Sequence, residues 1–596
     1  VEVAFNQQGE MFGTANIVHG TPRNDAILHW VHGGVYPRTD QEPVVAEFKR
    51  TGDLLPPVAF IGHVAPAGIA LPRSESWGPE YRDNLFYAEF NTHRVMRMPL
   101  QRHGATYRGA TQAFATTADS GVHFTDAIED ADGSLLVIDT GAWFYRGCPT
   151  SGASRPEITG GIYRIRRIGA PRPADPRGNA IAWKTSSPES LVALLGDPRH
   201  VVRDRAVAEL ARRGDAAVPA LTSALGNTNH LVRSNAVWAL TRIGSPAAQS
   251  AARRALLDRD ARIREVACQS AFVTSDREAV EMLMARLGDD SPSVQREAAR
   301  ALGRLRNPQA IPALGGAAAI PRDPILTHAL IYALIEIDAP TETRALLNHR
   351  APLARRAALL ALDASADRKL DAAPVFAALR DKEPALRSAA LQIAVRHPEW
   401  GRAAADYLAT VVAGSLDPAA QDVVARLLAA FLPAQEVRDW LRASPAPALD
   451  PVLLLDAIAS SPNAWDESWR ELLASSLHSA DTSRARAALR AIATHRQRGF
   501  AAMLQEVGRD PSRPVAFRVA ALQLTTGAEI EMDATSYDLL LGPFIGGGTP
   551  DARLQAATVL ADAKLSRAQL LALTDVMPAA GPVELQQLLG AFRRRP

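Results

Sequence analysis

The apolar residues follow different patterns in the two parts of the chain. Before residue 168, short apolar and aromatic segments alternate with turn signals, which is typical of β-strands. From about residue 190 the chain consists of Ala-, Leu- and Arg-rich segments that are typical of paired helices. The sequence therefore predicts strands in the first part and helices in the second. The predicted strands cover residues 85–90, 93–100, 123–128, 135–139 and 161–166.

A short motif recurs through the helical part: an apolar residue, Arg or Gln, two further residues and Ala, often after a turn such as 289–292. The closing alanines at 206, 236, 267 and 298 lie 30, 31 and 31 residues apart, and the register continues at Ala329, Ala357 and Ala390. A lone helix pair cannot bury its apolar face, so such units must stack on their neighbours. The motif resembles that of HEAT repeats, most closely over 190–400, and predicts an α-solenoid of HEAT-like repeats.

Arginine occupies the same place in three successive motifs, as Arg203, Arg233 and Arg264. We interpret these residues as structural, pairing with Asp between adjacent repeats of the solenoid. The alternative is that one surface of the solenoid binds a protein partner. His328 lies on a predicted helix, where we expect a packed or surface histidine rather than a ligand.

Composition changes at the same boundary as the pattern. Residues 1–167 contain 18 of the 34 Phe, Trp and Tyr residues, whereas the longer remainder contains 16. The stretch that follows is rich in Pro and Gly and has no helical or strand period, which is typical of a linker. We therefore predict a β-domain at 1–167, a linker at 168–188 and the solenoid at 189–596. The many short aromatic strands fit a propeller, a sandwich or a barrel.

Charge and cysteine content exclude several classes of protein. The 66 basic and 64 acidic residues leave a formal charge of +2, so no global basic field is available for nucleic acid or an anionic membrane. Two cysteines, Cys148 and Cys268, exclude a disulfide scaffold, a Cys-rich zinc module and an iron–sulfur cluster. The sequence has no Cys-x-x-Cys-His haem motif and no apolar run of the roughly 20 residues that a membrane span needs. The chain begins with Val and shows no signal peptide, so we expect a fragment of a longer protein.

Motifs follow one another in the β-domain at 63–68, 79–86, 93–97, 126–137 and 161–165. In this order they resemble the later blades of the soluble glucose/sorbosone dehydrogenases, six-bladed propellers that oxidise sugars with pyrroloquinoline quinone. Further segments, at 33–37, 90–95, 130–141 and 147–151, resemble the PVC-type membrane-bound dehydrogenases, a haem-binding multidomain family. The resemblance implies a partial β-propeller of about three blades out of six, followed by HEAT repeats.

The resemblance also singles out residues that would face a ligand. His63, His93 and His123 recur at 30-residue intervals near the starts of strands, and Thr125 and Asp126 follow the last of them. The inner strands of a propeller line its central channel, so these five residues are candidates for contacting a sugar or a metal. The alternative is that each histidine bonds a backbone group between blades.

The cofactors pyrroloquinoline quinone and calcium are implied by the resemblance alone. In the family, an Arg-x-Arg-Asp-Val run holds the carboxylates of the quinone, and the matching run here is 123–127, with His123 and Thr125 in place of the two arginines. A neutral hydroxyl cannot replace a guanidinium, so quinone binding in the family's manner is not expected. Asp130 and Asp132 are candidates for calcium, but a tight hairpin turn at Asp132-Gly133 explains them as well.

Two functions follow from these patterns. The first is an exported, periplasmic redox enzyme that oxidises a sugar or alcohol and passes electrons to a cytochrome domain. The second is a non-catalytic scaffold, in which the solenoid docks a protein partner and the propeller holds a glycan or a protein. The sequence favours the scaffold, because the solenoid is present while the family's cofactor cations are not. A partial propeller exposes sheet edges and an apolar face, so 1–167 alone should be insoluble and 186–596 soluble.

Overall fold

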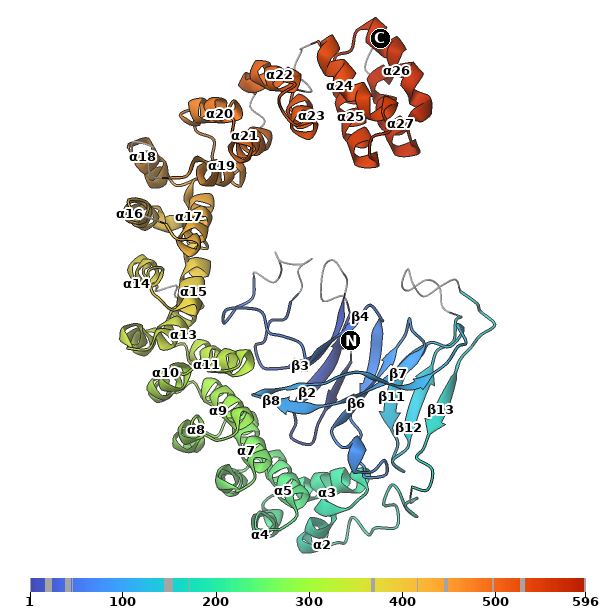
Figure 1. The fold of residues 1–596 in the computed structure, drawn as a ribbon. Helices are drawn as coiled ribbons and strands as arrows, with labels where there is room; N and C mark the ends of the chain where they lie inside the picture. Colours follow the sequence, from blue (N-terminus) through green and yellow to red (C-terminus); the bar gives the residue numbers. More distant parts are fainter. Residues whose placement is uncertain are drawn as a thin grey trace. The chain divides into compact units, whose positions relative to one another are not determined.

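The computed structural model divides the chain into two compact units (Figure 1). Unit 1 is Val1–Asp371 with Asp381–Ala389, and unit 2 is Ala372–Arg380 with Ala390–Pro596. The 147–151 motif and Cys148 lie outside the described residues. The structure describes residues 2–593 except for 17–23, 38–43, 45–46, 144–153, 171, 366–369, 415, 444–448, 496–497 and 526–530.

Unit 1 begins with antiparallel sheets that pack face to face in chain order. The first sheet has the order β1 (Val3–Phe5), β2 (Met11–Ala15), β3 (Asp25–Trp30), β4 (Ala59–Gly62). The second has the order β10 (Gln112–Thr116), β7 (Arg94–Pro99), β6 (Asn84–Glu89), β5 (Pro66–Ala70). The third consists of β11 (Phe124–Glu129), β12 (Leu135–Asp139) and β13 (Gly161–Ile165), and a separate hairpin consists of β8 (Gln101–His103) and β9 (Thr106–Arg108).

Strand β6 shows how the period-two pattern builds this stack, because successive side chains of a strand point to opposite faces. Leu85 and Tyr87 pack into a core with the first sheet, and Phe86 and Ala88 pack into a core with the third. All four side chains are fully buried. The second sheet is therefore covered on both faces, as a blade inside a propeller is. Among the described residues the sheets form no closed propeller.

The predicted hairpin turn joins β11 to β12. Gly133 has a φ of +78°, which favours glycine, and the Ser134 amide donates a hydrogen bond to Asp132 Oδ1 at 3.0 Å. A side chain at 133 would also meet the hydroxyl of Ser76, 2.1 Å from an added Cβ. The turn is thus fixed both by backbone conformation and by the segment packed against it.

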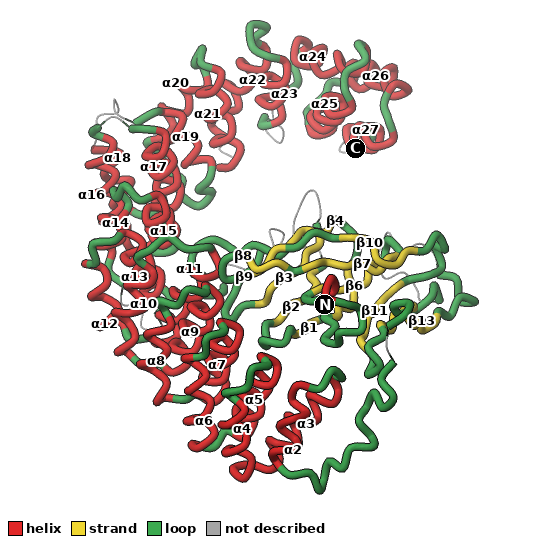
Figure 2. The backbone as a smooth tube through the Cα atoms, turned by 60° about the horizontal axis from the view of Figure 1, so that its bottom comes forward, coloured by secondary structure: helices red, strands yellow, loops and turns green. Residues whose placement is uncertain are grey.

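Helices fill the rest of unit 1, and the odd-numbered ones from α3 to α13 form an inner row that faces the sheets (Figure 1 and Figure 2). The row consists of α3 (His200–Arg213), α5 (His230–Ile243), α7 (Ala261–Thr274), α9 (Pro292–Leu305), α11 (Pro324–Ile337) and α13 (Pro352–Asp363). Between them lie α4 (Val218–Ala224), α6 (Pro246–Arg253), α8 (Val280–Arg286), α10 (Ile311–Ala318) and α12 (Pro340–Ala345), and α2 (Pro188–Ala193) precedes them all. The predicted fold class, β-sheets followed by an α-solenoid, is confirmed.

The recurring arginine is the fourth residue of α3, α5 and α7. Each of Arg203, Arg233 and Arg264 donates from Nη1 to two backbone carbonyls of the turn that precedes its own helix. Arg233 also donates from Nε to Asp258 at 2.9 Å, and Arg264 from Nε to Asp289 at 2.8 Å, in each case in the turn before the next inner-row helix. Arg233 and Arg264 therefore tie adjacent repeats to one another, whereas Arg203 donates from Nη2 to the Arg73 carbonyl of the sheet region at 2.9 Å.

Residues 168–187 contain no helix or strand among those described, yet they are anchored. Trp183 is 4% exposed and packs into a core with Leu191 and Leu195, and its indole Nε1 donates to the Gly178 carbonyl at 2.7 Å. The segment therefore ends as part of the first helical repeat.

Unit 2 consists of helices whose cores are built mainly from Leu, Ala, Val and Phe. No helix among the residues that the structure describes is long and apolar enough to cross a membrane. The unit includes α14 (Ala372–Ala378), α16 (Gly401–Val412), α17 (Pro418–Phe431), α18 (Gln435–Ala443), α19 (Pro451–Ala459), α20 (Trp469–Leu477), α21 (Thr482–His495), α22 (Ala501–Arg509), α23 (Val515–Gln523), α24 (Ala534–Ile545), α25 (Pro550–Asp562), α26 (Arg567–Val576), α27 (Pro582–Leu588) and α28 (Gly590–Arg593), while α15 (Pro384–Ala394) belongs in part to each unit.

Candidate functional site on the inner row of unit 1

The fifth residue of every inner-row helix faces the β-sheets. Asp204 accepts a hydrogen bond from Arg73 at 3.0 Å, and Glu265 accepts one from Arg102 at 2.8 Å. The residue type changes from helix to helix while its place is constant, so the row forms a specific surface for the sheets. The six residues are Asp204, Ser234, Glu265, Arg296, His328 and Arg356.

A buried charge cluster lies at the middle of this row. Glu10, which precedes β2, is 3% exposed and accepts from Arg296 Nη2 at 2.5 Å, while Arg102 approaches it at 3.2 Å. Arg296 also donates to the Ala105 carbonyl between β8 and β9. Burial alone would raise the pKa of Glu10, but the two guanidinium groups outweigh it and hold this pKa well below its ordinary value.

Glu265 stands beside Glu10 with the opposite protonation. Burial and the negative charge of Glu10 raise the pKa of Glu265 to about 8. Its Oε2 accepts from Arg102 and from the Ser293 hydroxyl at 3.1 Å, and Arg296 lies 3.5 Å from Oε1. At neutral pH Glu10 is thus charged and Glu265 is protonated. The two guanidinium groups therefore face one buried carboxylate from the sheet region and one neutral carboxylic acid from α7.

His328 makes the corresponding contact at α11. Burial lowers its pKa to about 4, so the ring is neutral at pH 7. Its Nδ1 lies 2.8 Å from the Thr51 hydroxyl and its Nε2 lies 2.8 Å from the His32 carbonyl. Both contacts reach the segment between β3 and β4, so this histidine is a packing residue, as the sequence predicts.

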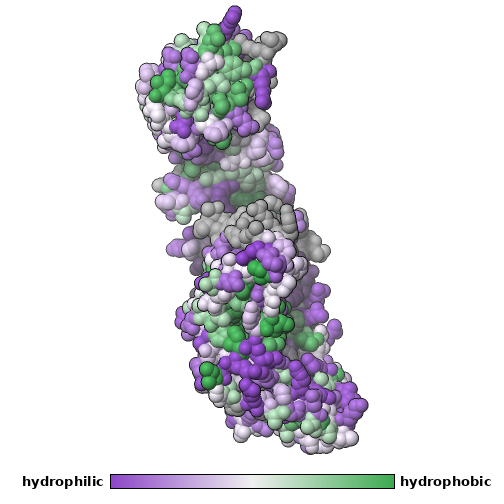
Figure 3. All heavy atoms as spheres, turned by 90° about the vertical axis from the view of Figure 1, so that its right-hand side faces the viewer, coloured by the Kyte–Doolittle hydropathy of each residue, from purple (hydrophilic) through white to green (hydrophobic). Residues whose placement is uncertain are grey.

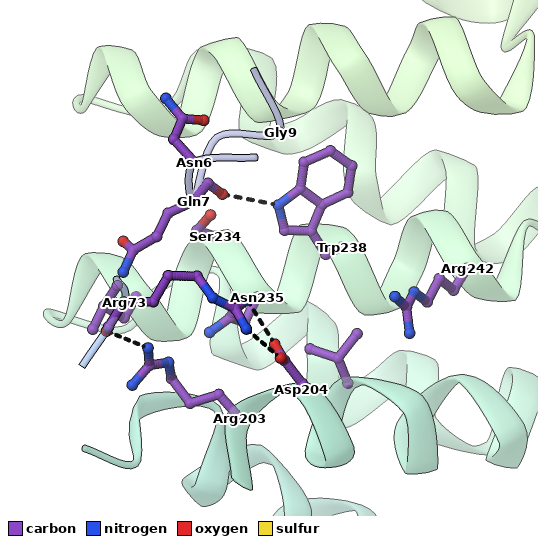
Figure 4. Close-up of a pocket in the computed structure, with 12 residues that line it drawn as sticks. Asn6, Gln7, Gly9, Arg73, Arg203, Asp204, Ser234, Asn235, Trp238 and Arg242 are labelled. Carbon is purple, nitrogen blue, oxygen red and sulfur yellow. Dashed lines mark hydrogen bonds and ion pairs between the residues drawn. The ribbon is translucent and has the colours of Figure 1, made fainter. Parts of the chain in front are cut away.

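Two glycines let the backbone of the sheet region approach the ninth residues of α5 and α11, Trp238 and Tyr332. Trp238 donates from Nε1 to the Gln7 carbonyl at 3.3 Å (Figure 4). Gly9 has a φ of +87°, and a Cβ there would lie 2.9 Å from the Trp238 ring. Gly33 has a φ of +70°, and its Cβ would lie 2.2 Å from Tyr332. Larger residues at these two positions would push the sheets off the helices.

Cavities remain along this contact, including two of unequal size. The smaller, about 190 Å³, is lined by Arg73, Asp204, Asn235 and Trp238, with the Arg73–Asp204 pair across it (Figure 4). The larger, about 630 Å³, lies at the first turns of α5, α7 and α9, where the lining includes Arg102, Arg262, His230 and Glu265. Both cavities combine charged groups of both signs with apolar surface, so they offer hydrogen-bonding groups of mixed charge to water or a ligand.

The predicted channel residues lie elsewhere, and the structure brings only some of them together. His93 and His123 meet between the second and third sheets with their rings 5.0 Å apart, and His93 Nδ1 lies 2.5 Å from the Val122 carbonyl. His123 is 2% exposed, and burial together with His93 lowers its pKa. His63, in the loop between β4 and β5, is exposed.

The residues that would hold a quinone do not fit that role. His123 is buried and neutral at pH 7, and the Thr125 hydroxyl donates to the Ile138 carbonyl at 3.5 Å. Asp126 lies against Glu2, and burial raises the pKa of both carboxyls, that of Glu2 further through the charge of Asp126. These groups supply acids and neutral donors but no cation for the carboxylates of pyrroloquinoline quinone.

Asp130 and Asp132 are committed to arginines. Arg164 lies 2.6 Å from Asp130 and Arg166 lies 2.9 Å from Asp132, and Arg177 approaches Asp130 at 3.1 Å. The hydrogen bond from Arg164 lowers the pKa of Asp130. A calcium ion would have to displace these guanidinium groups. No group of three or more metal-ligating side chains occurs in the part of the chain that the structure describes.

The fifth and ninth positions were not among the predicted site residues. The signal that could have found them is the register of the repeats: Arg recurs at the fourth position, whereas the next position changes between acid, hydroxyl, base and imidazole. Variation beside a constant residue indicates a surface that contacts something other than the next repeat.

The comparison with family models supports the solenoid. A family model of HEAT repeats matches residues 188–272 and 271–335. The karyopherin Kap121p is 12% identical with a TM-score of 0.36 and covers 67% of this chain, and a glucose dehydrogenase-type oxidoreductase from Thermus thermophilus is 20% identical with a TM-score of 0.20 and covers 27%. This chain spans 47% and 42% of those two chains, respectively. No curated protein matches the chain. Residues 188–335 therefore form HEAT repeats.

Proposed function

We propose that the protein is a binding scaffold whose odd-numbered solenoid helices hold protein surfaces. The observation that carries the proposal is the inner row of unit 1, where the fifth residues of all six inner-row helices face a folded β-sheet region. Contacts such as Arg296 with Glu10 join residues almost three hundred positions apart, so this is a tertiary docking of one folded region onto another. The same face of a repeat can hold a separate protein by the same contacts.

Two odd-numbered helices of unit 2, α17 and α21, carry charged residues at the equivalent positions without such a cover within the unit. The fifth and ninth residues of α17 are Asp422 and Arg426, and those of α21 are Arg486 and Arg490; none of these four side chains is buried. Of these four residues, only Arg490 forms an ion pair with another described residue, Asp456. Exposed pairs of this kind are weak and exchange readily for a partner's charges. A partner with a polar surface of mixed charge fits these positions.

Export and electron transfer remain predictions of the family resemblance. The same holds for sugar oxidation, because the residues at the matching positions do not fit the quinone. The scaffold proposal needs none of these activities, and it leaves a glycan-binding role of the sheets open to direct measurement.

The test is affinity capture with the intact chain and a variant of the exposed surface. Arg426→Glu combined with Arg486→Glu reverses two charges on α17 and α21, and Arg402→Glu on α16 is the matched control in the same unit. We expect proteins retained by wild type and control to fall by at least about tenfold with the double variant, since tenfold corresponds to only about 1.4 kcal/mol. Identical sets and amounts for all three baits would contradict the proposal.

A further inference from the structure

We propose that unit 1 contains a binding site for a tetrahedral oxyanion, phosphate or sulfate, where β13 leaves the third sheet. A cavity of about 410 Å³ lies there, and its lining includes Ser76, Trp77, Arg166, Arg167 and Arg172. It is separate from the inner row and from the predicted channel residues. Figure 3 views the side of unit 1 on which β13 lies, and hydrophilic residues gather there beside small hydrophobic spots.

The chain geometry at the end of β13 shapes the cavity. After Ile165 the chain passes through Arg166 and Arg167 and turns at Gly169, whose φ is +79°. The hairpin turn at Gly133 and the segment around Ser76 form the opposite wall, where the two approach so closely that only a glycine fits. Both walls are therefore fixed by the backbone, and the arginine side chains are the adaptable part.

The charge of the lining is positive. Three arginines stand against one carboxylate, Asp132, and that carboxylate already accepts from Arg164 and Arg166. Arg167 donates to the Trp77 carbonyl at 2.8 Å and reaches Glu80 only at 3.6 Å. Arg172 is exposed and has no ion pair among the described residues. Arg166 and Arg167 thus have acidic partners, and Arg172 is the guanidinium that an anion in the cavity would meet unpaired.

A buried donor without an acceptor points to the same ligand. Trp77 is 5% exposed, its ring packs against Tyr81 and Phe114, and its indole Nε1 has no hydrogen-bond partner among the described residues. Leaving a buried donor unsatisfied is unfavourable, and native structures normally provide an acceptor. An oxygen of a bound oxyanion would supply it.

The kinds of donor in the lining select the ligand class. Guanidinium forks match the paired oxygens of phosphate and sulfate, and the indole N–H and the Ser76 hydroxyl add single donors. A metal cation would meet three positive charges, and an apolar ligand would leave the donors unpaired. A free ion and a phosphate or sulfate ester of a small sugar share this chemistry, and the volume admits either.

The experiment is isothermal titration of the intact chain at neutral pH with inorganic phosphate, sulfate and acetate. We expect saturable millimolar binding of phosphate and sulfate and weaker binding of acetate. Arg172→Gln should weaken phosphate binding by about tenfold, because a charge-assisted hydrogen bond is lost. Trp77→Phe keeps the aromatic packing and removes the indole N–H, and should weaken it about threefold. Arg402→Gln, on α16, should bind like wild type.

Several outcomes would overturn the proposal: no saturable binding of phosphate or sulfate by wild type, equal binding by Arg172→Gln and wild type, or equal affinity for acetate and phosphate. A further titration with glucose 6-phosphate identifies the source. Tighter binding than that of inorganic phosphate supports an ester as the ligand, and equal binding supports the free ion. Circular dichroism of each variant shows whether it has kept its fold.

Discussion

Helices of unit 1 and of unit 2 include some with an arginine at the fourth position that bonds the chain before its own helix, whereas the fifth position differs from helix to helix. In unit 1, Arg264 bonds the turn before its own helix, and in unit 2 Arg553, the fourth residue of α25, likewise donates from Nη1 to the Gly548 carbonyl at 2.6 Å. The fifth residues differ, because Arg296 in unit 1 is buried against the sheets while Arg486 in unit 2 is exposed. The comparison teaches that the fourth position builds the solenoid and the fifth decides what it holds.

The charge cluster also shows why this contact is specific. A buried ion pair is a weak source of net stability, since desolvation offsets the attraction, but removing one partner leaves an uncompensated buried charge. The Glu10–Arg296 pair therefore selects one register of the sheets on the helices. An apolar contact of equal area would tolerate sliding.

The largest expected effect comes from Arg296→Gln. The variant leaves Glu10 and Glu297 buried with one guanidinium fewer, and we expect the free energy of unfolding of unit 1 to fall by about 3–5 kcal/mol in urea denaturation. The matched control is Arg304→Gln, an exposed arginine of the same helix, which should change it by less than about 0.5 kcal/mol. Equal losses in the two variants would show that the cluster is not what holds the sheets.

A smaller loss of stability is expected when the ion pair between two adjacent repeats, Arg264 with Asp289, is broken. Asp289 accepts from Arg264 at 2.8 and 2.7 Å with its side chain 1% exposed, so Asp289→Asn should lower the free energy of unfolding by about 2–3 kcal/mol. Asp290 contacts the same guanidinium at 2.5 Å but is 88% exposed. Asp290→Asn should therefore cost less than about 1 kcal/mol, and the reverse ranking in thermal or urea melts would refute the role of the buried pair.

The pH dependence of the stability of unit 1 tests the protonation state of Glu265. Its pKa of about 8 in the folded state exceeds its ordinary value of 4.5, so the folded protein keeps a proton that the unfolded chain releases between these pH values. Its contribution to stability is therefore full below pH 4.5 and falls as the pH rises toward 8, by at most about 1.4 kcal/mol per pH unit.

Glu265→Gln removes this loss of stability at rising pH, because glutamine does not titrate. Relative to wild type, the variant should gain stability steadily between about pH 5 and pH 8, as measured by urea midpoints at each pH. Glu281→Gln, an exposed position on α8, should run parallel to wild type. A constant difference between Glu265→Gln and wild type across this range would contradict the protonated state of Glu265.

The smallest effect is expected in unit 2. Arg426→Gln and Arg486→Gln remove exposed guanidinium groups, and each should change the free energy of unfolding by less than about 0.5 kcal/mol. Differential scanning fluorimetry of the intact chain is sufficient to show this. A loss above about 1 kcal/mol would mean that these positions stabilise unit 2 instead of remaining available to a partner.

Much of the fold follows from local sequence. The predicted strands at 135–139 and 161–166 correspond to β12 and β13 within one residue, because alternation and the Asp132-Gly133 turn are local signals. The repeat register placed the inner-row helices by their buried alanines, such as Ala206 and Ala298, which are 0% exposed. Short strands such as β1 and β8, of three residues each, carry too few alternating positions to be predicted.

The docking contact could not be predicted in the same way. Glu10 and Arg296 are far apart in the chain, and nothing near either residue indicates its partner. Gly9 and Gly33 give no sign in sequence that a helix side chain lies against them. The histidines at 30-residue intervals, by contrast, suggested a ligand; His123 is buried against His93, and a ligand at these histidines stays a prediction. A spacing along the chain indicates a repeat, but only packing shows which face of it is covered.

The most direct test of the central claim is to cut the linker of the intact chain. A specific protease site is inserted between Pro173 and Ala174, the protein is cleaved at neutral pH, and native mass spectrometry determines whether the pieces stay together. If the inner row holds the sheets, the two pieces remain a stable 1:1 complex, and the complex is lost in Arg296→Gln. Separation of the wild-type pieces without denaturant, with the sheet piece aggregating alone, would contradict the claim.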